Sequence, residues 1–278
     1  MDQEIHVDES FIRTGPLMDL QSYPRWVQGI VQECSEAKRG VAEHEIFQLM
    51  SEGEMPERAM RRFLAGVWPV IEQFPQYMAM NLLKVQYGSI GHEMARKYLI
   101  RNIRVEQNHV DYWMDWASAH GLNRDDLLFG WRSGPVDALS HWCWHTCERD
   151  SLFAAMAATN YAIEGVTGEW AAMVCVSQTY ENGFAPELRK KAMRWLKVHA
   201  QYDDTHPWEA LEIISTMVGN RPSAREIDTI QTGILKSYGY MHLAFDDCLA
   251  GEGKRWDAAE VAMPVRSEGE REVGESRH

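Results

Sequence analysis

The sequence predicts an all-α protein with one main domain. Apolar residues recur every three or four positions along most of the chain, whereas the strict alternation typical of half-exposed strands is missing. Glycine and proline fall between these periodic stretches, where they end or restart helices. The chain has 278 residues, 45% of them hydrophobic, which is enough for one large core. We therefore expect about seven or eight helices between residues 24 and 250.

The two ends of the chain differ from this centre. Residues 1–23 have no sustained periodicity and are expected to form an irregular lead-in. Residues 251–278 mix acidic and basic side chains with few large apolar groups, which is typical of a disordered tail.

Composition excludes several function classes. A formal charge of −13 and a pI near 5.3 argue against nucleic-acid binding, which needs clustered Lys and Arg. Without a run of 18 apolar residues or a signal-peptide pattern, the chain is expected to be cytoplasmic and to lack a stable membrane anchor. Five scattered cysteines predict reduced thiols. The oligomeric state stays open, a homodimer included.

The first half of the domain predicts two helical stretches. One begins at Pro24, is interrupted near Gly40 and stops at Gly53. The other covers residues 56–83, and its two internal prolines should kink or break it because proline lacks an N–H and clashes with the preceding turn.

A third helix, over residues 92–120, carries the first candidate ligands. Glu106 and His109 fall within its apolar stripe, which includes Leu99 and Val110. A buried carboxylate is costly unless it is paired or binds a cation, and Glu-x-x-His is the spacing with which helix bundles present ligands to iron or manganese. The same spacing also arises by chance, so this motif alone does not establish a metal site.

A fourth helix begins at Pro135 and contains four residue types that bind zinc. His141 and His145 share one face of this helix, whereas Cys143 and Cys147 lie roughly 160° away. The four side chains therefore cannot close on one ion, and a packed aromatic helix with buried thiols is the better interpretation.

A fifth helix, from residue 150 to 176, carries Glu164 on its inward stripe. A solvent-facing Glu usually pairs with Lys or Arg, but residues 154–176 contain neither. A metal is then the natural counter-charge. Gly165 should let a neighbouring helix approach closely.

The segment that follows holds the densest set of candidate ligands. At about 100° per residue, His199, Asp203 and His206 fall on one face of a helix, and Pro207 should kink or restart it. Taken alone, the segment also fits a solvated helix face with two surface histidines.

The last helix is predicted to begin at the capping box Ser223-Ala-Arg-Glu226. His242 on this helix is interpreted as a core or surface histidine without a ligand partner.

Together the inward-facing polar residues form a set of three carboxylates and three imidazoles. The members are Glu106, His109, Glu164, His199, Asp203 and His206. Such a mixed oxygen and nitrogen set suits two irons, or iron with manganese, whereas a structural zinc site would draw on thiolates.

This ligand pattern resembles that of the haem-oxygenase-like di-iron oxidases, which are helical bundles without haem. Within that family the chain is most similar to the bacterial fatty acid decarboxylases that form 1-undecene. The similarity extends from about residue 11 to 249 and includes every candidate ligand. It is carried by residues 11–18, 101–109, 140–146, 158–165 and 199–214.

The resemblance implies a concrete activity. A medium-chain saturated fatty acid, such as dodecanoic acid, would lose a β-hydrogen and CO2 to give a terminal 1-alkene, with Fe(II), O2 and an external electron donor. It also implies that one iron is held by Glu106, His109 and His199. The other would be held by Glu164, Asp203 and His206, with Glu164 bridging the two.

Other functions fit the same residues. A relative on this scaffold could act on another carboxylate or an amine, or act without metal on a thiamin or quinone precursor, although those metal-free relatives lack the full ligand set. The chain could also be a non-catalytic iron-binding protein. A helical interaction protein with merely hydrogen-bonded polar groups is the third class.

Overall fold

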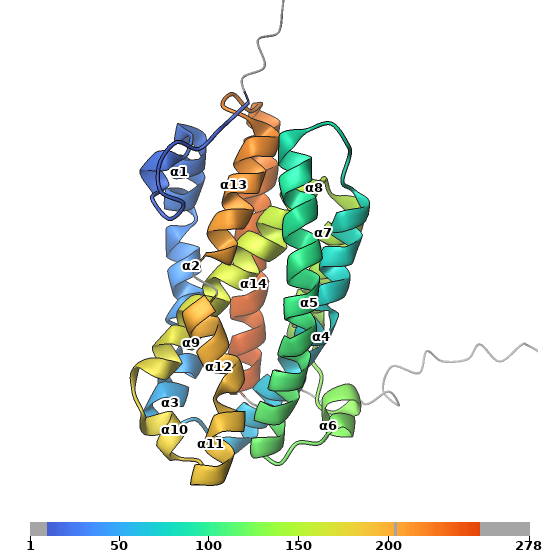
Figure 1. Cartoon of the computed structure of the whole chain (residues 1–278). Coiled ribbons are helices and arrows are strands. Elements are labelled where there is room, and N and C mark those ends of the chain that lie inside the picture. Colours follow the sequence, from blue (N-terminus) through green and yellow to red (C-terminus); the bar gives the residue numbers. More distant parts are fainter. Residues whose placement is uncertain (1–9, 203–204, 251–278) are drawn as a thin grey trace, which may run out of the picture.

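The structure is a computed structural model that describes residues 10–202 and 205–250 (Figure 1). Within these residues the chain forms fourteen α-helices, one 3₁₀ turn and one π-helix, and no strand. The predicted all-α class is confirmed. Residues 10–23 of the predicted irregular lead-in are described, and the 3₁₀ turn over Leu20–Ser22 is the one helical element among them. Residues 1–9 and the predicted tail over residues 251–278 lie outside the described residues.

Several predicted helices are divided into shorter segments. In chain order the elements are η1 (Leu20–Ser22), α1 (Arg25–Glu33), α2 (Ser35–Ala42), α3 (Glu45–Glu52), α4 (Glu57–Leu83), α5 (Ile90–Ala119), α6 (Arg124–Phe129), α7 (Gly134–Arg149), α8 (Leu152–Met156), η2 (Ala157–Ile163), α9 (Glu164–Val176), α10 (Thr179–Asn182), α11 (Pro186–Ala192), α12 (Arg194–Tyr202), α13 (His206–Val218) and α14 (Ala224–Ala250).

Breaks in the first half differ from those predicted. Gly40 lies inside α2, because one glycine weakens a helix by only about 1 kcal/mol. The interruption comes at Cys34, between α1 and α2. Gly53 ends α3 with a left-handed φ of 73°, as predicted. Pro69 and Pro75 do not break α4, whose apolar residues on either side of them are buried.

The connection after α5 contains a helix that we did not predict. Asn123 Oδ1 accepts hydrogen bonds from the backbone N–H groups of Asp125 and Asp126, and the Asp126 side chain accepts one from the Asn123 N–H. This capping box starts α6. The predicted capping box of Ser223 and Glu226 does start α14.

The helices pack into an elongated bundle around a shared apolar core (Figure 1). The two longest helices of the first half, α4 and α5, pack against each other, and α14 packs on α4 and α7. α12 and α13 follow one another along the bundle, and both contact α5 and α9. The candidate ligands lie where α5, α9, α12 and α13 meet. No helix in the described part of the chain has the length and apolar character needed to cross a bilayer.

A close contact between α5 and α13 gives a stability test. A Cβ built on Gly91 would lie 2.6 Å from Met217 Cγ and 2.8 Å from its backbone nitrogen. Gly91→Ala should therefore force α13 to move and lower the free energy of unfolding by about 1 to 3 kcal/mol. Gly239→Ala in α14 is the control, because no atom lies within 4 Å of its built Cβ. Urea unfolding measures both, and an unchanged midpoint for Gly91→Ala would contradict the contact.

Candidate metal centre

A π-helix leads into the first candidate ligand. Residues 150–176 were predicted as one helix, but α8 gives way to η2, and α9 begins at Glu164. π-turns inside α-helices are rare and occur frequently at functional sites. Here the turn directs Asn160 and Glu164 into the bundle, where both are buried.

Two neutral donors hold the Glu164 carboxylate. Its Oε2 accepts hydrogen bonds from Tyr98 Oη at 3.0 Å and from Asn160 Nδ2 at 2.9 Å, and its Oε1 lies 4.0 Å from His206 Nδ1. Burial, together with the Glu164 charge, raises the pKa of Tyr98 well above its ordinary value, so this phenol remains a donor. Glu164 thereby keeps a fixed orientation beside His206.

The predicted histidine pair is split between two helices. His199 lies on α12, whereas His206 is the first residue of α13, so the prediction of one continuous helix face is wrong. The restart at Pro207 is confirmed, because proline fits the first turn of a helix. A Cβ on Gly165 would lie 3.0 Å from Pro207 Cβ, which confirms the close approach predicted there. Asp203 lies outside the described residues.

Three further candidate ligands form a second group. Glu106 Oε2 and His109 Nδ1 on α5 are 3.0 Å apart, and the ring centroids of His109 and His199 are 4.4 Å apart. His199 Nδ1 lies 2.8 Å from the Trp195 carbonyl oxygen, so Nδ1 carries the proton and Nε2 is the nitrogen that can ligate a metal. Such a hydrogen bond on the far nitrogen is how metal-binding histidines are oriented.

The two groups share one buried region. Tyr98, which holds Glu164, lies on the same helix as Glu106 and His109, and the helices that carry His199 and His206 both pack against this helix. Five of the six predicted site residues thus converge from α5, α9, α12 and α13. These five residues offer carboxylate oxygen and imidazole nitrogen donors, which suit iron, and none of the five is a cysteine. That these residues bind metal stays a prediction.

The cysteine and histidine cluster on α7 has the arrangement we predicted. Cys143 and Cys147 are buried, whereas His141 and His145 are exposed. Burial raises the pKa of Cys147 to about 12, which keeps its thiol protonated. The four side chains therefore face different environments.

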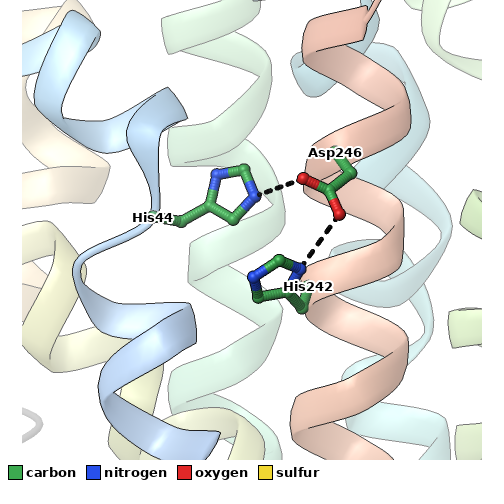
Figure 2. A group of neighbouring side chains, drawn as sticks. All are labelled: His44, His242 and Asp246. Carbon is green, nitrogen blue, oxygen red and sulfur yellow. Dashed lines mark hydrogen bonds and ion pairs between the residues drawn. The ribbon is translucent and has the colours of Figure 1, made fainter.

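One cluster was not predicted from the sequence, and it consists of His44, His242 and Asp246 (Figure 2). Asp246 accepts from His44 Nε2 at 3.2 Å and from His242 Nδ1 at 3.0 Å. The i, i+4 spacing of His242 and Asp246 was a usable signal. His44 is distant in sequence, and no local pattern predicts its place here.

The protonation of His44 favours a structural role for this cluster. One ligand atom from each residue lies within 4.8 Å of the others, which is close enough to share a metal ion. However, His44 Nδ1 accepts the backbone N–H of Ile46 and so caps α3. Nε2 must then carry the ring proton that it donates to Asp246. A metal at Nε2 would need this proton removed and would compete with the cap.

His44 should make stability depend on pH. Burial lowers the pKa of His44 from 6.5, and the nearby His242 lowers it further. The hydrogen bond that His44 donates to Asp246 raises this pKa, but only in part offsets the effect of burial. As pH falls below 6.5 the unfolded chain binds more protons than the folded one, so the free energy of unfolding should decrease. His44→Asn keeps a capping side chain but does not titrate. The urea midpoint of His44→Asn should fall less between pH 7 and pH 5 than that of the wild type. If both midpoints fall by the same amount, His44 is not the group that makes stability depend on pH.

Known proteins share both the sequence family and the fold of this chain. A family model described as iron-containing redox enzyme matches residues 61–239, which is more than half of the chain and includes all five described candidate ligands. A TenA homologue from Pseudomonas syringae pv. tomato is 52% identical, with a TM-score of 0.85 over 87% of this chain and 99% of that one.

More distant relatives agree on the fold. A domain of unknown function with a haem-oxygenase-like fold from Shewanella denitrificans has a TM-score of 0.65 at 12% identity, covering 82% of this chain and 96% of that one. A 4-aminobenzoate synthase from Chlamydia pneumoniae is 21% identical over 201 residues, which cover 70% of this chain and 83% of that protein. None of these relatives is described as a fatty acid decarboxylase, the activity that the sequence resemblance implied.

Proposed function

Because the chain belongs to the iron-containing redox enzyme family, we propose that it is a non-haem iron oxidase that uses O2 to act on an organic carboxylate. The observation that carries this proposal is the convergence of Glu106, His109, Glu164, His199 and His206 in one buried region. Buried carboxylates beside imidazoles are the donor set of helix-bundle iron sites.

Each side chain has a distinct part in this proposal. Glu106, His109 and His199 would hold one iron, and Glu164 with His206 and Asp203 would hold a second. When bound, iron supplies the one-electron chemistry that lets O2 react with an unactivated C–H bond. Tyr98 and Asn160 hold the Glu164 carboxylate in place, and the Trp195 indole, stacked on His199 at 3.7 Å, shields that ligand from water.

Medium-chain fatty acids are the proposed substrates, and oxidative decarboxylation to a 1-alkene is the proposed reaction. This finer assignment rests on the sequence resemblance over residues 11–249. The surroundings of the candidate ligands are apolar, because Trp195 stacks on His199 and the fully buried Trp113 and Trp116 pack on Trp195. An apolar chain would supply most of the binding free energy there.

A second candidate is the formation of an aromatic amino acid of the 4-aminobenzoate type. The observation that favours it is the similarity to three chlamydial 4-aminobenzoate synthases, at 21% to 27% identity. We assign both candidate activities to the same residues, so the product distinguishes them.

One experiment tests both candidates. The purified protein is loaded anaerobically with Fe(II) and then mixed with O2, a reductant and a panel of saturated fatty acids. Headspace analysis detects 1-alkenes, and chromatography detects 4-aminobenzoate in parallel samples without fatty acid. 1-Alkene supports the decarboxylase, 4-aminobenzoate alone supports the second candidate, and a protein that retains no iron refutes both. Glu164→Gln is the matched variant, since it keeps the size of the side chain but removes its charge.

A further inference from the structure

A stack of buried tryptophans extends from the candidate centre towards one end of the bundle. The Trp195 indole stacks on the His199 imidazole with centroids 3.7 Å apart, and on Trp116 with centroids 5.6 Å apart at 22°. Trp113 and Trp170 pack on Trp195 at 4.8 and 5.3 Å. The rate of electron transfer falls steeply with the distance between donor and acceptor. Several short steps between rings in contact are therefore far faster than one long step through aliphatic side chains.

Tyr180 continues this stack through a hydrogen bond. Trp116 Nε1 donates to Tyr180 Oη at 2.8 Å, and Tyr180 Oη lies 2.8 Å from His120 Nε2. An indole nitrogen can only donate, so the phenolic proton of Tyr180 is the one that bonds His120. Burial lowers the pKa of His120 to about 4, which leaves Nε2 neutral and able to accept that proton at pH 7.

The far end of the chain of rings opens on a surface pocket. A cavity of about 420 Å³ is lined by Met55, Met60, His120, Tyr180 and Phe184 among other residues. Tyr180 itself is only 7% exposed, so a molecule in the pocket can approach the ring while bulk water has little access. The residues that line the pocket come from the end of α5 and from α10 among other segments, and none of them is a candidate ligand. Figure 1 shows α10 at the lower end of the bundle.

Proton acceptors are distributed unevenly along these rings. Trp195 Nε1 and Trp170 Nε1 are buried and have no hydrogen-bond acceptor among the described residues. An indole oxidised there cannot pass its proton to a neighbour, so it would readily take an electron back from the next ring. Tyr180, beside His120, is where electron loss and proton loss can occur together.

We propose that Trp195, Trp116 and Tyr180 form an electron relay between His199 and this pocket, and that His120 is its proton acceptor. One electron leaves Tyr180 and passes through Trp116 and Trp195 towards His199, where iron already oxidised by O2 would accept it. The phenolic proton moves to His120 Nε2, leaving a neutral tyrosyl radical. A one-electron donor in the pocket then reduces the radical, and His120 returns the proton. The relay rests on the proposed iron oxidase function and adds the point at which electrons enter.

The first test looks for the radical in the iron-loaded protein. The protein is mixed with O2 without substrate or reductant, frozen, and examined by electron paramagnetic resonance. A tyrosyl signal that changes on ring-deuteration of tyrosine is expected in the wild type, and Tyr180→Phe should lose it. Tyr238→Phe is the control, because Tyr238 is also buried but lies outside the relay. Trp116→Phe should also lose the signal, whereas Trp68→Phe, another buried tryptophan, should keep it.

The second test does not depend on iron. In the metal-free protein, azide radicals generated by pulse radiolysis oxidise tryptophan, and transfer to tyrosine is followed by the loss of indolyl and gain of tyrosyl absorbance. The tyrosyl yield should fall in Tyr180→Phe and not in Tyr238→Phe. Equal yields in wild type and Tyr180→Phe would overturn the relay, as would an unchanged tyrosyl signal in iron-loaded Tyr180→Phe. Failure of the wild type to bind iron would instead refute the proposed function, whatever the yield in this second test.

Discussion

Replacing Glu106 with alanine should strip most of the iron from the protein. Glu106 is 7% exposed, and its carboxylate lies 3.0 Å from His109 Nδ1, so its removal deletes one proposed ligand and a hydrogen-bond partner of another. Losing only a partner that orients a ligand lowers metal affinity by about 10- to 100-fold, and losing the ligand itself should cost more. His199→Ala should have the same effect, since it removes the ligand on α12.

Iron content after anaerobic loading and gel filtration measures this loss. His145→Ala is the matched control, because His145 is an exposed helical histidine beside two cysteines, outside the proposed site. It should retain as much iron as the wild type. If His145→Ala loses iron while Glu106→Ala keeps it, the metal lies on α7 and the proposed ligand set is wrong. Circular dichroism of each variant separates loss of ligands from loss of fold.

Helical periodicity was enough to predict that the two candidate ligands on α5 face the core. Glu106 and His109 interrupt an apolar stripe, and the cost of burying a bare carboxylate makes such an interruption informative. Both are buried and in contact. The same reasoning placed Glu164 inward and Gly165 against a neighbouring helix, because small and polar residues on a core face need a specific reason to be there.

Irregular backbone could not be predicted in this way. Periodicity assumes 3.6 residues per turn, so it cannot reveal the π-helix before Glu164 or the separation of His199 and His206 onto two helices. Both departures depend on packing between α9, α12 and α13. The contact of His44 with Asp246 joins residues far apart in the sequence and likewise depends on tertiary structure.

The affinity for saturated fatty acids should rise with chain length and then fall abruptly. Each methylene moved from water into an apolar site contributes about 0.8 kcal/mol, which is about a fourfold change in Kd. This gain is needed because the net charge of −13 repels the substrate carboxylate, so the positive charge of iron must attract it locally. Once the site is full, a further carbon has to displace packed side chains, at a cost of about 1 to 3 kcal/mol. Titration calorimetry with acids of increasing length measures the profile.

An acid with both β-hydrogens replaced by methyl groups separates binding from chemistry. The proposed decarboxylation removes a β-hydrogen, so a β,β-dimethyl acid should occupy the site, compete with dodecanoic acid and release no alkene. Its two added methyl groups sit near the carboxylate, so a straight acid of equal carbon number controls for size. A flat dependence of affinity on chain length, or normal CO2 release from the blocked acid, would contradict the fatty acid assignment. Iron binding at Glu106 and His199 would then still support an oxidase, and the aromatic acid of the second candidate would become the substrate to pursue.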